Sequence, residues 1–438
     1  MKGGWLITMF DNEIIMQGER LKRIRNMYHI TQNEMSEGIC TRNNLSLIEN
    51  NRQNLSCNLA IELANRFNQI IEKKGLDVKS ITADFLTKDV NEQANEVFVS
   101  ILKTLEEIQT IDVAEKNLYE AEILIENYNI PDIKKIELYN LMADIYYNRY
   151  QYAKSNEMCN NGLKVCINSK NIEAEVNFYL YISRNSIKGF HHNEALIELN
   201  YAERLNNSIC NSDFCELIFY NKGLAYKKLG DYDNALKYLR LLKERDTKNQ
   251  NLLIKARIVC ANCLNEQHKF EEAEKEYIET LDLANDLGDK NFIALCYKNL
   301  SELYYNEEKY KDAKKYINAA MIPNNEYLNE IYYFAAKVLQ NLNEDVEHYL
   351  LQALDICEKN DRENLDLIEK IIYELVLIYM EKKKENNIMR MVEKLDILNI
   401  DITLIYPVII GYYMHRNIEA SIQLNKKYIE KIKHIKII

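Results

Sequence analysis

Residues 31–49 read TQNEMSEGICTRNNLSLIE, and this stretch predicts two short helices joined by a tight turn. Thr31 is a favoured N-cap residue, and Glu34 follows it at the spacing of a capping box. The Gly-Ile-Cys segment supplies the turn, because glycine adopts backbone angles that other residues avoid. Thr41 is the N-cap expected for the second helix, which is predicted over residues 42–49.

The outer face of this second helix is polar. Arginine can pair bidentately with guanine and asparagine with adenine, and an α-helix has the right width for the major groove. The glutamine that opens the preceding helix, and the Arg-Gln pair after this one, are placed for phosphate contacts. We therefore predict double-stranded DNA as a partner. The predicted DNA-binding residues are Gln32, Thr41, Arg42, Asn43, Asn44, Ser46, Arg52 and Gln53. The alternative is a helical module that binds a protein.

Residues 18–69 as a whole predict a small helical domain. Leu21, Ile24 and Met27 form the apolar side of its first helix, and Ser56 caps its last. The basic residues expected to face outward from the first helix are Arg20, Lys22, Arg23 and Arg25. The domain has seven Lys or Arg and five Asp or Glu, a net charge of +2, whereas the whole chain carries −11. A weakly basic domain on an acidic chain would turn toward nucleic acid.

These residues resemble the DNA-binding domain of phage repressors, the Xre/Cro type. The resemblance rests on Leu21…Ile24-Arg25, Thr31-Gln32-x-Glu34-Met35 and Leu45-Ser46-x-Ile48-Glu49-Asn50. The turn Glu37-Gly38-Ile39-Cys40-Thr41-Arg42 is similar to the version in RRNPP regulators, which sense peptides in Gram-positive bacteria. The resemblance implies a helix-turn-helix domain that binds DNA.

Composition predicts that the rest of the chain is helical. The 438 residues include only 11 Gly and 3 Pro, and this scarcity of helix breakers favours an all-α protein of two or three units. No apolar run reaches the ~18 residues that span a bilayer. Ten Cys without an export signal are read as reduced thiols, so a cytoplasmic location is expected. Residues 1–17 are expected to be disordered or a mis-assigned start.

A repeat follows. Several segments of the chain share a small residue and aromatic positions. The small residue recurs at Ser155, Ala195, Ala235, Ala273 and Ala313. This pattern resembles the tetratricopeptide repeat, in which small residues let two antiparallel helices approach closely. We therefore expect a right-handed α-solenoid of tetratricopeptide-like repeats over residues 97–438. Residues 70–96 are predicted to be a linker helix, with a hinge between 70 and 87.

Polar side chains at corresponding positions of the first helix of each repeat are predicted to bind a peptide. A side-chain amide offers both a donor and an acceptor, and can therefore hold the main chain of an extended peptide. The alternative is a merely solvated face. The predicted peptide-binding residues are Asn140, Asp144, Arg184, Asn221, Lys228, Asn262, Asn299 and Asn306.

The order of these parts resembles the RRNPP architecture over almost the whole chain. The resemblance implies a cytoplasmic homodimer that binds a short quorum-sensing peptide and regulates transcription of sporulation, toxin or virulence genes. Dimerisation through the C-terminal repeats would place two DNA-binding domains on two half-sites. The half-sites would be separated by about one helical turn of DNA, or by a multiple of one turn. The alternative is an adaptor whose repeats sequester a response regulator, a kinase or a phosphatase.

An enzyme is not expected, and neither is a cofactor. The sequence has no Gly-rich phosphate loop, no HExxH and no nucleophile elbow. Cys260 and Cys263 form the only CxxC, but a zinc site needs a second pair of ligands. His191 and His192 fall at the turn of a repeat, where they are read as substitutes for its usual aromatic residue. No metal site is predicted.

Overall fold

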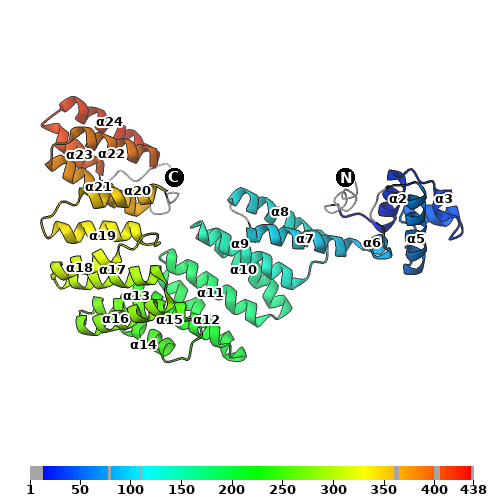
Figure 1. Ribbon diagram of the computed structural model, residues 1–438, viewed down its shortest axis with the longest axis horizontal. Coiled ribbons are helices and arrows are strands. Elements are labelled where there is room, and N and C mark those ends of the chain that lie inside the picture. Colours follow the sequence, from blue (N-terminus) through cyan, green and yellow to red (C-terminus); the bar gives the residue numbers. More distant parts are fainter. Residues whose placement is uncertain (1–12, 77–79, 108–109, 360–364, 399–404, 436–438) are drawn as a thin grey trace. The chain divides into compact units, whose positions relative to one another are not determined.

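The computed structural model describes residues 13–76, 80–107, 110–359, 365–398 and 405–435. Every regular element in these ranges is an α-helix (Figure 1), which confirms the predicted all-α class. The chain divides into two compact units, residues 1–221 and 222–438, and the division falls within α13 (Ser212–Lys228). Among the helices described, none is long and apolar enough to cross a membrane.

The first helices are short and are capped as predicted. They are α2 (Gln17–Met27), α3 (Gln32–Ser36), α4 (Arg42–Glu49), α5 (Cys57–Lys73) and α6 (Ala83–Thr87). Thr31 and Glu34 form the reciprocal capping box, and the hydroxyls of Thr41 and Ser56 accept backbone N–H groups of α4 and α5. Gly38 has a φ of 76°, so the turn before α4 uses the freedom of glycine.

The core of these helices extends beyond residue 69. Phe67 and Leu45 lie at its centre, and Ile81 and Leu86 are buried in the same cluster. We call α2–α6 the head and the helices from α7 onward the body. The hinge predicted between residues 70 and 87 therefore overlaps the packed head, and its residues 77–79 lie outside the described residues. Residues 1–17 were predicted to be disordered or a mis-assigned start. Residues 1–12 lie outside the described residues, whereas residues 13–17 are placed.

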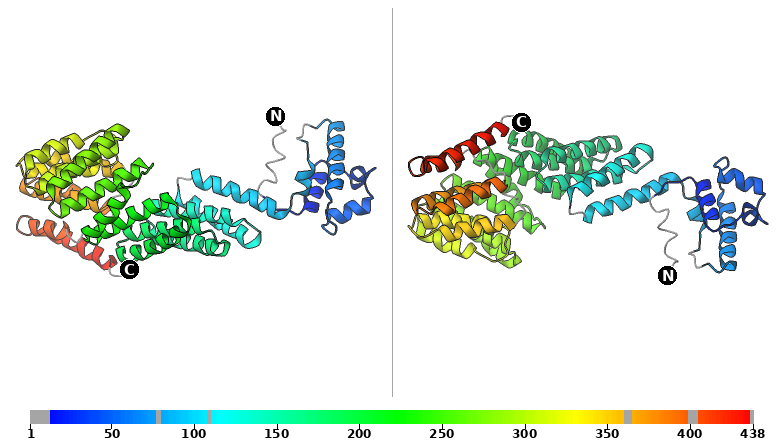
Figure 2. Two further views of the ribbon diagram at one scale, coloured as in Figure 1. Left: turned by 90° about the horizontal axis from the view of Figure 1, so that it is seen from below. Right: turned by 90° about the horizontal axis from the view of Figure 1, so that it is seen from above.

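Within each unit of the body, most consecutive helices pack against their neighbours in the chain (Figures 1 and 2). In the first unit these are α7 (Val90–Glu107), α8 (Ile111–Asn127), α9 (Asp132–Asn148), α10 (Tyr152–Ser169), α11 (Ile172–Lys188) and α12 (His192–Ile209). In the second they are α14 (Tyr232–Lys243), α15 (Gln250–Glu266), α16 (Phe270–Leu287), α17 (Lys290–Asn306), α18 (Tyr310–Ala320), α19 (Leu328–Gln340), α20 (Glu347–Lys359), α21 (Leu365–Glu381), α22 (Glu385–Leu398), α23 (Ile405–Met414) and α24 (Ile418–Ile435).

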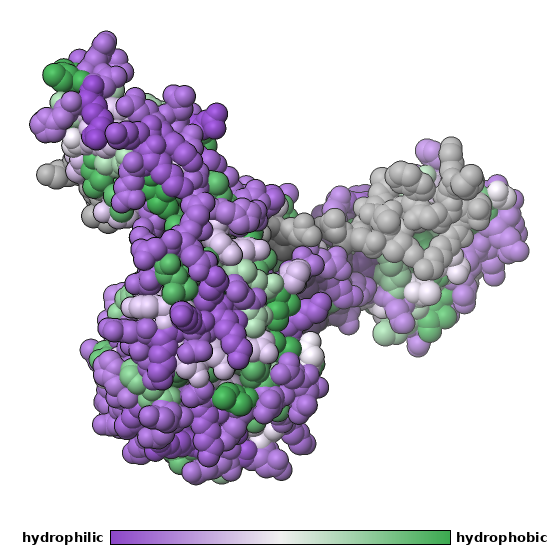
Figure 3. Space-filling model, turned by 60° about the vertical axis from the view of Figure 1, so that its left-hand side comes forward, coloured by the Kyte–Doolittle hydropathy of each residue, from purple (hydrophilic) through white to green (hydrophobic). Residues whose placement is uncertain are grey.

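The small residues of the repeat lie at close helix contacts, as predicted. Ser155, Ala195, Ala235, Ala273 and Ala313 are all fully buried. Ser155 adds a hydrogen bond of 2.8 Å from its hydroxyl to the Ala143 carbonyl of the preceding helix. Buried apolar residues continue along each unit. The face shown in Figure 3 is largely hydrophilic, with scattered apolar areas. Each unit of the body therefore contains stacked helical hairpins.

Candidate functional site

Five of the eight predicted DNA-binding side chains are exposed, on α4 or beside it. Arg42 and Asn43 are exposed in its first turn. Thr41, Arg52 and Gln53 are exposed beside it, whereas Gln32, Asn44 and Ser46 are half-buried. The Thr41 hydroxyl is already engaged, because it accepts the backbone N–H of Asn44 at 3.1 Å. The predicted residues thus lie on α4, at the start of α3 and in the segments just before and after α4.

The buried carboxylate of Glu49 accepts hydrogen bonds from residues at and near this site. It is 1% exposed, and its two oxygens accept from Nε and Nη2 of Arg25 at 2.5 and 2.9 Å. Gln32 Nε2 donates to the same carboxylate at 2.8 Å, which leaves Gln32 Oε1 directed to Arg42 Nε at 3.5 Å. One buried carboxylate therefore orients two residues of the candidate site.

Two arginines that were predicted to face outward do not. Arg20 is only 2% exposed, its guanidinium donates to the Phe85 carbonyl, and it lies over the Phe85 ring. Burial lowers the pKa of Arg20 from its usual value. The side chain of Arg25 is 11% exposed because it pairs with Glu49. Periodicity alone missed both, because the partners come from distant segments.

In the first unit the structure brings together three of the predicted peptide-binding residues. Asp144 accepts from Arg184 Nη2 at 2.8 Å and from the Tyr181 hydroxyl at 3.1 Å. The Arg184 guanidinium lies 3.8 Å from the centre of the Tyr147 ring, between α9 and α11. Asn140 accepts from Asn177 at 3.3 Å. These polar groups tie neighbouring helices to each other, so a peptide would have to compete with those bonds. Asn221, on α13, is half-buried.

The other predicted peptide-binding residues lie in the second unit, and they differ in exposure and in hydrogen bonding. Lys228 and Asn306 are exposed, and Asn306 donates to the Asn265 side chain at 3.4 Å. Asn262 can donate to the Ile258 carbonyl and accept from Lys227, both at 3.2 Å. Asn299 is only 4% exposed, so its expected place on an open face was wrong. It lies on the side of α17 that faces neighbouring helices.

A groove that sequence reasoning missed runs along helices of the second unit. Two adjoining hollows of about 330 and 510 Å³ share Tyr333 and Lys370 as lining residues, and together they extend over α17, α19, α21 and α23. The lining alternates aromatic and charged side chains. The remaining lining residues are Lys298, Glu330, Phe334, Asp366, Leu367, Glu369, Tyr373, Glu374 and Val408. The only indication of this groove in the sequence was that the repeat continues through these helices. The small and aromatic residues that mark the repeat are less regular in this region.

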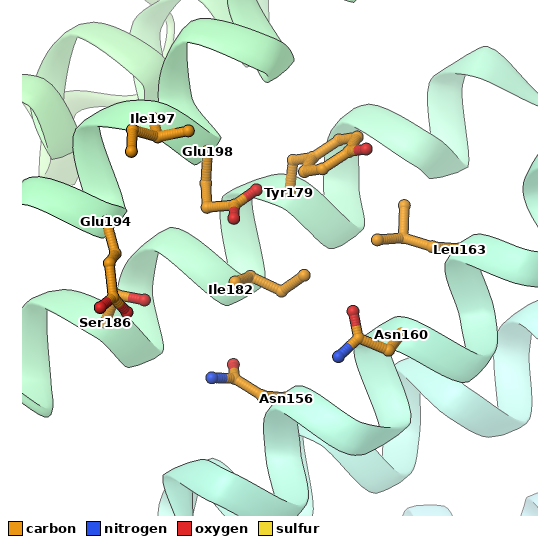
Figure 4. A pocket seen from close by; sticks show the side chains of 9 residues that line it. All are labelled: Asn156, Asn160, Leu163, Tyr179, Ile182, Ser186, Glu194, Ile197 and Glu198. Carbon is orange, nitrogen blue, oxygen red and sulfur yellow. The ribbon is translucent and has the colours of Figure 1, made fainter. Parts of the chain in front are cut away.

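Another hollow, of about 460 Å³, lies among α10, α11 and α12 (Figure 4). Leu163, Ile182 and Tyr179 supply apolar surface, and Glu194 and Glu198 come from α12. Burial, and secondarily Glu194, raises the pKa of Glu198. This hollow combines an apolar surface with two carboxylates, and would accept an aliphatic side chain that ends in a cation.

The described residues offer no cluster of three or more His, Cys, Asp or Glu that could hold a metal ion. The two thiols of the CxxC segment are buried on α15. Burial raises the pKa of Cys260 to about 11 and that of Cys263 to about 12. His191 Nδ1 lies 3.7 Å from a Glu194 oxygen at the start of α12, in the repeat turn that the sequence indicated.

Comparisons with known proteins find similarity in structure only. No protein-family model matches the sequence, and no curated protein is significantly similar to it. The apo form of the quorum sensor NprR from B. thuringiensis matches with a TM-score of 0.51 at 14% identity, over 78% of this chain and 96% of that one. Aspartyl phosphate phosphatase F from Bacillus subtilis matches with a TM-score of 0.47 at 12% identity, over 90% and 96%.

A further match is a Rap protein complexed with competence and sporulation factor, with a TM-score of 0.46 at 12% identity, over 78% of this chain and 98% of that one. At identities this low, the match to NprR speaks to the fold and not to the activity. Together with the packing of consecutive helices, it shows that the chain has the fold of a tetratricopeptide-like α-solenoid.

Proposed function

We propose that this protein is a transcription regulator that binds double-stranded promoter DNA through α4 and responds to a short signalling peptide. The observation that carries the proposal is the start of α4, where Arg42 and Asn43 are exposed above a buried carboxylate that orients their neighbours. A helix with an arginine and asparagines on its outer face matches the hydrogen-bonding groups of the major groove. Arg52 and Gln53 would contact phosphates.

The groove of the second unit is the place we assign to the peptide. It extends over four helices, and its aromatic rings and its charges of both signs would bind apolar and charged side chains of an extended chain. Lys298 lies between Glu302 at 3.4 Å and Glu330 at 4.0 Å, so the charges along this wall are partly paired. The quorum sensor NprR has a similar fold, which is compatible with a peptide ligand.

A homodimer completes the proposal. The last described helix, α24, exposes Ile418, Ile422 and Ile429 at 67%, 51% and 46%, and their spacing puts them on one face. A row of exposed apolar side chains on one helix face favours a protein partner, here proposed to be a second copy of the chain. Two heads would bind two half-sites, and a peptide would alter DNA affinity only through its different affinity for two conformations of the body.

Family and physiology rest on the resemblance of the sequence. The proposal places the protein among the RRNPP regulators, in the cytoplasm, controlling sporulation, toxin or virulence genes. Footprinting of the full-length protein on its own promoter tests the function directly. A protected pair of half-sites supports it, and absence of local protection at every protein concentration below that at which the whole probe is covered non-specifically would overturn it.

A second candidate function is a protein-binding adaptor, and the hollow among α10, α11 and α12 favours it. Next to that hollow, Ile197 is 54% and Tyr201 45% exposed on α12, an apolar surface beside two carboxylates. Such a surface fits a basic, aliphatic segment of a response regulator, kinase or phosphatase. The two functions differ in which surface matters. An adaptor would retain its activity after substitution of Arg42, and a DNA-binding regulator would not.

A further inference from the structure

One side chain of the body binds both backbone groups of a residue in the segment ahead of α2. The Ile15 N–H donates to Gln93 Oε1 at 3.1 Å, and Gln93 Nε2 donates back to the Ile15 carbonyl at 2.8 Å. Gln93 lies near the start of α7 and is 8% exposed, and Ile15 is 9% exposed. A glutamine that satisfies both backbone groups of one residue imitates a strand partner, and burial makes both bonds costly to lose.

The neighbours of Ile15 contact both the body and the head. Ile14 packs against the hydrophobic cluster of α7–α11, in the body. Glu13 pairs with Arg23 of α2, in the head. These residues therefore contact the first helices of the body on one side and α2 on the other.

Further bonds connect the start of α2 to the junction before α7. The Gln17 side chain donates to the Thr87 carbonyl, at the end of α6. Arg20 donates to the Phe85 carbonyl, and its other nitrogen reaches the Ile15 carbonyl at 3.4 Å. The bonds to Thr87 and Phe85 join residues that are far apart in sequence. The bond from Arg20 to Ile15 is buried and so shielded from competition with water.

We infer that residues 13–17 form a strap that fastens the head to α7, as a second connection beside the chain itself. With the chain alone, the head could turn about residues 88 and 89, between α6 and α7. With the strap, rotation there would require breaking the Gln93 bonds and withdrawing Ile14. The role of the strap rests on the proposed function. A conformational change in the body would be transmitted through the strap to the DNA-binding helix, instead of being absorbed by rotation about residues 88 and 89.

The test is hydrogen–deuterium exchange on the full-length protein, with Gln93→Ala as the variant. Loss of both bonds should speed exchange of the Ile15 amide by about thirtyfold, since each hydrogen bond contributes roughly 1 kcal/mol. The matched control is Gln340→Ala, at the exposed end of α19, which should leave that exchange unchanged. Equal exchange of the Ile15 amide in Gln93→Ala and in the unaltered protein would overturn the strap.

A second variant guards against a local folding defect in α7. Ile14→Asp leaves Gln93 in place but puts a charge against the apolar cluster, and it should also speed exchange of the Ile15 amide. If exchange within α7 rises as much as exchange at Ile15, then α7 itself has been damaged and the strap is refuted as a separate element. Neither measurement uses DNA or peptide, so the strap and the proposed function can fail independently.

Discussion

Arg25 of α2 and Glu49 of α4 form a two-pronged ion pair beneath the candidate DNA-binding face, with N–O distances of 2.5 and 2.9 Å. Arg25 also donates to the Ile30 carbonyl at 2.7 Å, so the guanidinium ties together α2, the loop before α3 and α4. Because Glu49 receives Gln32 as well, the pair couples the stability of the head to the position of the side chains that would meet DNA.

Glu49→Ala should destabilise the head strongly. Removal of one partner from a buried pair leaves the other charge uncompensated, at a cost of about 3–5 kcal/mol. Glu37→Ala is the matched control, since Glu37 pairs with Arg66 at the surface and is 73% exposed; such pairs contribute at most about 1 kcal/mol. Amide exchange in α2 and α5 of the full-length protein measures the difference. Equal exchange in the two variants would show that the pair has no stabilising role.

Arg42→Ala combined with Asn43→Ala should weaken operator binding at least tenfold without unfolding the head. Both side chains are exposed, and each bidentate base contact contributes roughly 1–3 kcal/mol. A gel shift on the footprinted promoter, at fixed salt, measures the change. The control changes an exposed pair on α12, Arg204→Ala with Asn207→Ala. Undiminished binding by the α4 double variant would mean that another surface reads the DNA.

Local signals in the sequence predicted the start of every head helix that they named. Capping depends on residues three positions apart, so Thr31 with Glu34, and Thr41, could be read directly. Arg20 and Asn299 could not, because their burial depends on partners and neighbours that only the fold brings close. The groove around Tyr333 and Lys370 was hidden for a related reason: it combines residues of successive repeats whose landmarks are weak.

Gly162→Leu should destabilise the first unit. A Cβ atom at residue 162 would lie 2.1 Å from Cζ of Phe178, which is fully buried between helices. Overpacking of this kind costs about 3 kcal/mol. The matched control is Gly411→Leu on α23, where an added Cβ meets nothing within 4 Å, and helix propensity should make the change neutral or stabilising by up to ~1 kcal/mol. Denaturant midpoints distinguish the two.

The cysteines should separate into reactive and protected groups at pH 8. The thiolate is the reactive form, and a raised pKa reduces its fraction, so Cys260, with a pKa of about 11, is about one-thousandth ionised at that pH. Cys57 and Cys210 are exposed and should be alkylated first by iodoacetamide. Mass spectrometry locates the modified residues, and rapid modification of Cys260 or Cys263 in the folded protein would contradict the burial of these two thiols.

Ile418→Asp together with Ile422→Asp should convert the proposed dimer to monomers. Both side chains are more than half exposed on α24, so the change should cost the fold little, whereas two carboxylates in an apolar interface would remain unpaired. Ile197→Asp is the control, because Ile197 is similarly exposed, at 54%, on α12 of the first unit. Sedimentation equilibrium gives the mass of each variant. If the unaltered protein is a dimer and the double variant remains one, the apolar face of α24 is not the interface. If the double variant is monomeric and loses binding to paired half-sites but keeps binding to one, then dimerisation through α24 is what sets two heads on the operator.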